Sequence, residues 1–243
     1  MSSSEMNFAR SKSRARKRRD FTVRSKARIS NGTVEGHAQR SLIKGDLSEN
    51  LYRALSREAT VGCDTETSGL NPLQDQIGTF QLYGPTVGAV VVQLQPDGKS
   101  SNLGRLLENP DVRKVFHHAP FDLRFILAHW RITPRNVACT KIASKLVARD
   151  VAPECHSLRF LLKELLSVEI NKGERRSNWL ADELSASQIA YACADVEHLV
   201  ELFDVLYADL TNRGLAATYE SCLAFLPTRT SLDLGGWPDV FLY

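Results

Sequence analysis

Two acidic residues, Asp64 and Glu66, stand one residue apart inside the apolar stretch that runs from Val61 to Ser68. Side chains alternate between faces in an extended strand, so both acids point the same way, with their α-carbons roughly 6–7 Å apart. This spacing lets both reach one divalent cation, because Mg²⁺ and Mn²⁺ prefer oxygen ligands. The alternative is a strand end with a solvated acidic face, and the pair alone leaves both interpretations open.

Two further acids and a tyrosine stand downstream. Asp122 falls in the first turn of a predicted helix that follows a strand. Tyr191 and Asp195 are four residues apart in a later predicted helix, which puts them on one face. Each has an ordinary alternative, since an acid in a first turn complements the helix dipole and a helical tyrosine often packs beside a solvated acid. These three residues are therefore candidate site residues only if the fold brings them close to Asp64 and Glu66.

The composition is that of a globular protein, with 243 residues of which 43% are hydrophobic and 24% are charged. No apolar run approaches the roughly 20 residues that span a bilayer, and the N-terminus lacks the apolar core of a secretory signal. We expect a cytoplasmic protein with no membrane partner. The five cysteines are scattered without a Cys-x-x-Cys pair, which predicts reduced thiols.

The N-terminal segment differs from the rest in charge. Residues 1–30 hold ten Lys or Arg and two acids, a balance of +8, which leaves −5 for the remainder because the whole chain carries +3. Residues 1–38 have no hydrophobic period, which predicts a disordered basic tail ahead of one domain over 39–243. The tail is interpreted as an electrostatic arm for nucleic acid, an organelle transit peptide or a dispensable extension.

Hydrophobic periods and turn residues predict a single α/β domain. A helix capped by Asp46 or Ser48 precedes three strands at 59–66, 77–83 and 88–94, whose short connections imply an antiparallel meander. Alternating helices and strands follow, so a mixed sheet with flanking helices is expected. These later elements are a helix at 102–109, a strand at 113–117, a helix at 121–130, a strand at 137–140, helices at 141–148 and 158–166, a basic loop at 173–178, and a long helix from the capping box Ser185-Ala186-Ser187-Gln188 to about 212.

Taken together, Asp64-x-Glu66 on a strand, Asp122 after a strand and Tyr191-x-x-x-Asp195 in a late helix resemble the three exonuclease motifs of the DEDD superfamily in its tyrosine-bearing form. The resemblance implies a ribonuclease H-like fold. It also implies that the four acids and Tyr191 are the catalytic residues, and that all four acids bind metal.

The likeness extends beyond the acids. Residues 172–180 and 188–195 resemble ribonuclease D, and residues 42–241 resemble its small single-domain nano-RNase C branch, notably over 139–146 and 225–237. This branch implies a ring-like homo-oligomer, such as an octamer, with the C-terminal tail (225–243) at subunit contacts. It also implies a 3′-to-5′ exoribonuclease that releases nucleoside 5′-monophosphates from short RNA, dinucleotides included. The alternatives are trimming of longer RNA or duplex DNA, and a noncatalytic nucleic-acid-binding module.

Clustered carboxylates repel one another unless cations lie between them, and two cations roughly 3.5–4 Å apart can stabilise both the attacking and the leaving oxygen of a phosphodiester. The resemblance assigns Asp64, Glu66 and Asp195 to one Mg²⁺ or Mn²⁺ ion. It assigns Asp64 again, with Asp122 through water, to the second ion. Tyr191 is expected to orient the attacking water or help to deprotonate it.

Substrate contacts are predicted at several neighbours of these acids. Leu70 resembles the leucine that wedges between terminal bases in short-RNA exonucleases, and its alternative is packing beneath a turn. Several basic and polar residues are predicted to contact the substrate. These residues are Thr65, His117, His118, Lys172, Arg175 and Arg176. For the basic loop the alternative is that its charges are simply solvated. For the histidines at the strand end the alternative is a ring whose hydrogen bonds are satisfied by the backbone.

Overall fold

The computed structural model describes residues 40–95, 101–170, 173–237 and 239–242. The predicted N-terminal tail and Lys172 lie outside these ranges. Within them, no helix is both long and apolar enough to cross a bilayer.

Six strands form one mixed sheet in the order β1-β4-β3-β2-β5-β6. The predicted meander is confirmed, because β3 pairs antiparallel with both β2 and β4, while β5 and β6 continue the sheet parallel to β2. The edge strand β1, parallel to β4, was not predicted because it is only five residues long and half exposed. The strands are β1 (Arg40–Lys44), β2 (Thr60–Thr67), β3 (Ile77–Gly84), β4 (Gly88–Gln93), β5 (Arg113–Phe116) and β6 (Val137–Cys139).

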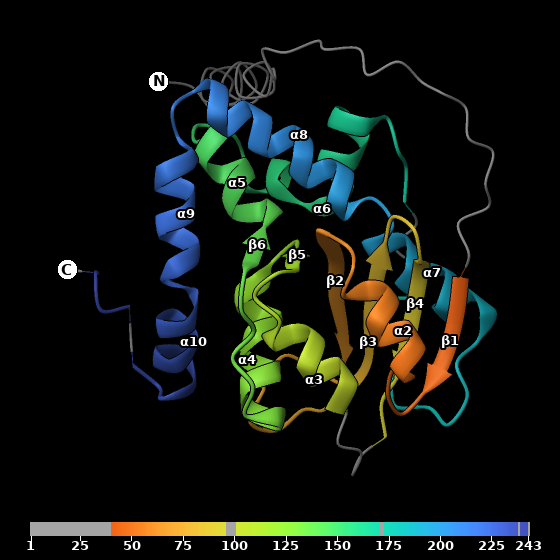
Figure 1. Cartoon of the computed structure of the whole chain (residues 1–243). Coiled ribbons are helices and arrows are strands. Elements are labelled where there is room, and N and C mark those ends of the chain that lie inside the picture. Colours follow the sequence, from red (N-terminus) through yellow and green to blue (C-terminus); the bar gives the residue numbers. More distant parts are fainter. Residues whose placement is uncertain (1–39, 96–100, 171–172, 238, 243) are drawn as a thin grey trace, which may run out of the picture.

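Helices cover both faces of this sheet (Figure 1). In that view α2 lies in front of the central strands and α7 behind them, which confirms the single α/β domain. The helices are α2 (Glu49–Leu55), α3 (Ser101–Glu108), α4 (Ala119–Trp130), α5 (Thr140–Val147), α6 (Leu158–Leu161), α7 (Ala186–Val196), α8 (Leu199–Asn212), α9 (Ala216–Ala224) and α10 (Leu226–Leu234), with a 3₁₀ turn at Pro153–His156.

Polar side chains fix the starts of three helices. Ser48 caps α2, one of the two residues predicted for it. Asp46, the other, instead accepts hydrogen bonds from the amides of Asn102 (2.8 Å) and Leu103 (3.0 Å) at the start of α3. The capping box of α7 is confirmed, since Ser185 and Gln188 each accept a bond from the other's amide.

The single long helix predicted to reach residue 212 is wrong, because it breaks after Val196 and resumes as α8 at Leu199. The Val196 carbonyl packs so closely on strand β2 that a Cβ at Gly62 would lie 2.8 Å from its oxygen. Arg40 of β1 also holds Glu197 with two bonds of 2.6 and 2.7 Å. No Gly or Pro marks this break, so it is set by tertiary contacts.

Two other regions differ from the sequence prediction. The helix expected over 158–166 is α-helical for only four residues and then becomes a π-type turn, Leu162–Leu166, which ends at Ser167 with φ 58°. Helices α9 and α10 were not predicted, and they form a column beside α4 and β6 (Figure 1). Leu226 and Thr230 of α10 are buried there, so part of the predicted subunit-contact tail belongs to the core.

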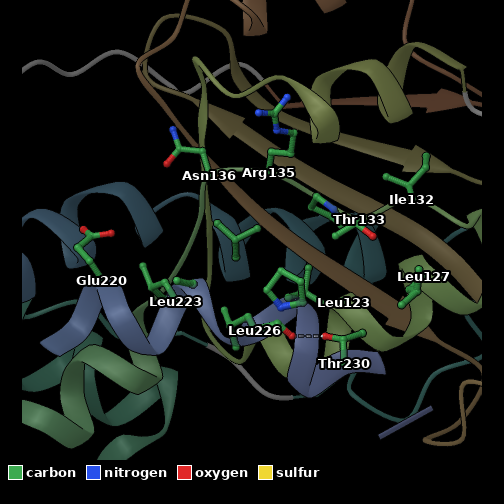
Figure 2. Close-up of a pocket in the computed structure, with 14 residues that line it drawn as sticks. Leu123, Leu127, Ile132, Thr133, Arg135, Asn136, Glu220, Leu223, Leu226 and Thr230 are labelled. Carbon is green, nitrogen blue, oxygen red and sulfur yellow. Dashed lines mark hydrogen bonds between the residues drawn. The ribbon is translucent and has the colours of Figure 1, made fainter. Parts of the chain in front are cut away.

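A pocket of about 380 Å³ lies between α4 and the α9–α10 column (Figure 2). Leu123 and Leu127 of α4 face Leu223 and Leu226 across it. The carboxylates named above are not among its lining residues, so this apolar pocket is separate from them.

We predict that Tyr219→Phe destabilises the domain by about 1–3 kcal/mol, because it leaves buried polar groups unpaired. The Tyr219 hydroxyl accepts a bond from the Cys139 amide (2.9 Å) and donates one to the Cys139 carbonyl (3.2 Å), which joins α9 to β6. Urea unfolding measures the loss. Tyr207→Phe, on a partly exposed neighbouring ring, is the matched control and should change stability by less than about 0.5 kcal/mol. Equal losses in both variants would contradict the prediction.

Candidate active site

Three carboxylates meet on one face of the sheet. Asp64 and Glu66 of β2 and Asp195 of α7 each offer an oxygen, and these oxygens all lie within 4.8 Å of one another. Strand alternation puts the first two on one face. Gly62, two residues earlier on that face, leaves room for the end of α7, which brings Asp195 above the strand.

Asp122 reaches the same edge through the parallel pairing of β2 with β5. The carboxyl ends of parallel strands meet at one edge, and the chain passes from β5 directly into the first turn of α4, where Asp122 lies. Its side chain is only 2% exposed, and its Oδ1 accepts a 2.7 Å bond from the Thr65 hydroxyl. The Thr65 hydroxyl thus orients this carboxylate, and a contact of Thr65 with substrate stays a prediction.

Burial makes these carboxyls reluctant to ionise. Burial, followed by the charges of Asp122, Asp195 and Glu66, holds the pKa of Asp64 well above its ordinary value. Burial and Asp195 raise the pKa of Glu66 to about 8, and burial raises that of Asp122 to about 7. A group of partly buried oxygen donors that resist a joint negative charge suits a hard divalent cation such as Mg²⁺ or Mn²⁺.

Tyr191 lies one helical turn before Asp195 and is partly buried. Burial, the nearby charges of Asp195 and Glu66, and a hydrogen bond to Asp195 raise the pKa of its hydroxyl far above the ordinary value. The hydroxyl therefore stays protonated at physiological pH. A protonated phenol can donate a hydrogen bond, so an orienting role is open to it.

Leu70 stands on a rigid turn, where its side chain is 76% exposed. Asp75 accepts a bond from the Asn71 amide (2.8 Å), and its carbonyl oxygen lies 2.9 Å from Nε2 of His129 on α4. The alternative that Leu70 packs beneath the turn is wrong. An apolar side chain is instead held out in water beside the carboxylate strand.

The two histidines differ in what they leave free. Both ring nitrogens of His117 are used within the protein, Nδ1 with the Thr140 hydroxyl (2.9 Å) and Nε2 with the His156 carbonyl (3.1 Å). The structure therefore supports the alternative of a strand-end histidine satisfied by its neighbours. His118 is exposed at the start of α4, so its ring remains a candidate for substrate.

Positive charge gathers near this edge. Arg175 and Arg176 are exposed on the 173–178 loop. The charge of Arg175 opposes the upward shift in the pKa of Glu66, and it adds to the desolvation that lowers the pKa of Lys141. Lys141 and Lys145 of α5, which were not predicted as site residues, lower the pKa of His118 after partial desolvation does so. They reach this edge because α5 starts at the carboxyl end of β6, beside those of β5 and β2, and this pairing is not visible in the sequence alone.

A family profile described as 3′-5′ exonuclease matches residues 41–211. Ribonuclease D of Gluconacetobacter diazotrophicus is 34% identical over 176 residues, which are 72% of this chain and 44% of that protein. This chain therefore spans less than half the length of that relative.

Solved structures of exonucleases are also similar to this chain. Brucella melitensis NrnC is 37% identical with a TM-score of 0.77, and the match covers 84% of this chain and 98% of that one. That protein has also been solved with bound Mg²⁺ and bound to pGG. Escherichia coli RNase D matches 78% of this chain and 50% of its own at 24% identity, with a TM-score of 0.68. These likenesses confirm the predicted ribonuclease H-like fold.

We predict that Asp64→Asn stabilises the metal-free domain at pH values above about 8, where the raised pKa values make ionisation of the cluster most costly to folding. The gain should be about 1 kcal/mol, or about 3 °C in Tm for a domain of this size. Thermal unfolding in EDTA measures it, with Asp111→Asn at an exposed site as the control.

Added Mg²⁺ should raise the Tm of the wild type, because a ligand that binds only the folded state stabilises it. It should raise the Tm of Asp64→Asn much less. Equal Mg²⁺ shifts in both proteins would contradict a cation at this cluster.

Proposed function

Because this chain belongs to the 3′-5′ exonuclease family whose profile it matches over residues 41–211, we propose that it hydrolyses RNA stepwise from the 3′ end. The observation that carries the proposal is the convergence of Asp64, Glu66 and Asp195 within 4.8 Å, with buried Asp122 linked to them electrostatically. The noncatalytic alternative leaves no reason for so costly a group of partly buried acids.

The roles follow from position. Asp64, Glu66 and Asp195 would hold one divalent cation, and Asp64 with Asp122 a second, either Mg²⁺ or Mn²⁺. Bound cations of this kind acidify water and neutralise the charge that develops on a phosphodiester under attack. The Thr65 hydroxyl fixes the direction of the Asp122 carboxylate.

Tyr191 acts as a neutral hydrogen-bond donor that orients the attacking water. Its protonated state follows from burial and from the acids around it. The charges of Arg175, Lys141 and Lys145 attract the phosphates of the substrate to this edge.

Short RNA, dinucleotides included, is the proposed substrate, and nucleoside 5′-monophosphates are the products. Two observations support it. This chain matches nearly the full length of Brucella melitensis NrnC, a protein solved with pGG. Leu70 is also exposed on a turn that directly follows the carboxylate strand, where an apolar side chain can pack against a base.

A second candidate is the trimming of longer RNA or duplex DNA. It is favoured by the charge of +8 on residues 1–30, which would hold a long polyanion near the site.

We also propose a ring-like homo-oligomer, supported by exposed apolar side chains at the C-terminal end, namely Trp237, Val240, Phe241 and Leu242.

A substrate-length series tests these candidates. With Mg²⁺ and Mn²⁺ in parallel, a 5′-labelled RNA dinucleotide should be cleaved with a kcat/KM at least about tenfold higher than an RNA of about twenty nucleotides. Equal or faster cleavage of the long RNA, or of duplex DNA, would contradict the short-RNA proposal in favour of the second candidate.

Leu70→Ala should raise KM for the dinucleotide by about tenfold, since the buried contact of a leucine with a base is worth about 1.5 kcal/mol or more. Leu73→Ala is a matched control, because Leu73 is 70% exposed on the same turn. It should change KM by less than about twofold. Steady-state kinetics measures both, and equal effects of the two variants would contradict a specific contact at Leu70.

A further inference from the structure

The side chain of Trp179 lies against the ring of Tyr191. The two ring centroids are 6.0 Å apart, and the ring planes are tilted by 40°. Trp179 is 1% exposed and is among the largest fully buried side chains of the described residues. It comes from the segment between the basic loop and α7, so its contact with the helix is made by tertiary structure.

The main chain around Trp179 is fastened to the sheet. Gly78 of β3 packs directly on it, and a Cβ at Gly78 would collide with the Trp179 carbonyl. Two residues further on, Gln93 of β4 donates a 2.7 Å bond to the Ala181 carbonyl, and Lys44 of β1 donates a 3.1 Å bond to that of Asp182. Three strands therefore fix the segment that carries the indole.

The segment is also tied to α7 itself. Gln188 donates a 3.1 Å bond from its side chain to the carbonyl of Asn178, while the same side chain completes the capping box at the start of the helix. Gln188 stands one turn before Tyr191 in α7. The position of the tryptophan is thus set relative to the helix that carries the tyrosine.

The indole also has an unexplained cost. Its Nε1–H is buried and has no hydrogen-bond partner among the described residues. Leaving a buried donor unpaired is unfavourable, and an aliphatic side chain such as leucine would fill part of the volume without that penalty. A role of the aromatic ring beyond filling space would explain why a tryptophan stands here. Among the described residues, the aromatic ring that it contacts is that of Tyr191.

Tyr191 needs such a support. Its hydroxyl is hydrogen-bonded to Asp195 at the carboxylate cluster. Its ring can rotate about χ1 and χ2 unless a neighbouring side chain prevents this. A displacement of about 1 Å in a group that orients a reactant can cost about 100-fold in rate. A side chain that packs against the Tyr191 ring therefore affects turnover without contacting the substrate.

From these contacts we infer that Trp179 is a positioning residue, which holds the Tyr191 ring so that its hydroxyl stays at the carboxylate cluster. The inference rests on the proposed function, because it assigns to Trp179 an action through the water-orienting tyrosine.

A double-mutant cycle tests it with the full-length chain. Trp179→Leu should lower kcat on a short RNA by about tenfold and change KM by less than about twofold. In a Tyr191→Phe background the same substitution should lower kcat by less than about twofold, because the hydroxyl that it misplaces is already absent. An equal fall in kcat in both backgrounds would overturn the inference.

Two further variants separate positioning from packing. Trp179→Phe should recover most of kcat, since it restores a ring against Tyr191. Phe203→Leu, at a buried aromatic of α8 that contacts Tyr207 and Tyr219, controls for lost packing and should leave kcat unchanged. If Phe203→Leu lowers kcat as much as Trp179→Leu at a matched loss of Tm, packing alone explains the effect and the inference is overturned.

The inference and the proposed function fail in different ways. A Tyr191→Phe variant as active as the wild type would overturn the inference. The wild-type hydrolysis seen in that same experiment would leave the exonuclease proposal standing.

Discussion

The cost of bringing four carboxylates together in a partly desolvated site is the constraint on which the rest of the site depends. Asp64, Glu66, Asp122 and Asp195 come from a strand, a helix start and a helix end that are far apart in the chain. The pKa values of Asp64, Glu66 and Asp122 are raised, so these three groups are harder to ionise in the folded protein than in water. The surrounding fold therefore has to hold the four side chains together against this cost.

That rigidity has identifiable sources. The parallel pairing of β2 with β5 places the first turn of α4 beside the acidic strand. Gly62 lets α7 end against the same strand, and the pair of Arg40 with Glu197 fastens that end to the sheet edge. On the outer side, α10 packs along α4. The carboxylates are thus held from both flanks, by apolar packing and by this ion pair.

Much of this could be read from the sequence, because it rests on local rules. Strand alternation put Asp64 and Glu66 on one face, the four-residue spacing put Tyr191 above Asp195, and Ser185 with Gln188 marked the start of α7. The break after Val196 could not be read, since it comes from contacts with Gly62 and Arg40 and not from a helix-breaking residue.

The limits of prediction for the substrate contacts have the same origin. His117 looks available in the sequence, yet Thr140 and His156 occupy its nitrogens. Lys141 carries no motif signal of its own, and it joins the site because β6 lies next to β5. Distant pairing, which a single sequence does not show, decided both.

The most direct test of a carboxylate-bound cation site is the release of nucleoside 5′-monophosphates from short RNA by the wild type and by Asp64→Asn, with Mg²⁺ or Mn²⁺ and with EDTA. The wild type should release them only with metal, and Asp64→Asn should lose at least about 1,000-fold in turnover while RNA binding changes by less than about threefold. Unchanged turnover in Asp64→Asn, or equal turnover in EDTA, would contradict the site.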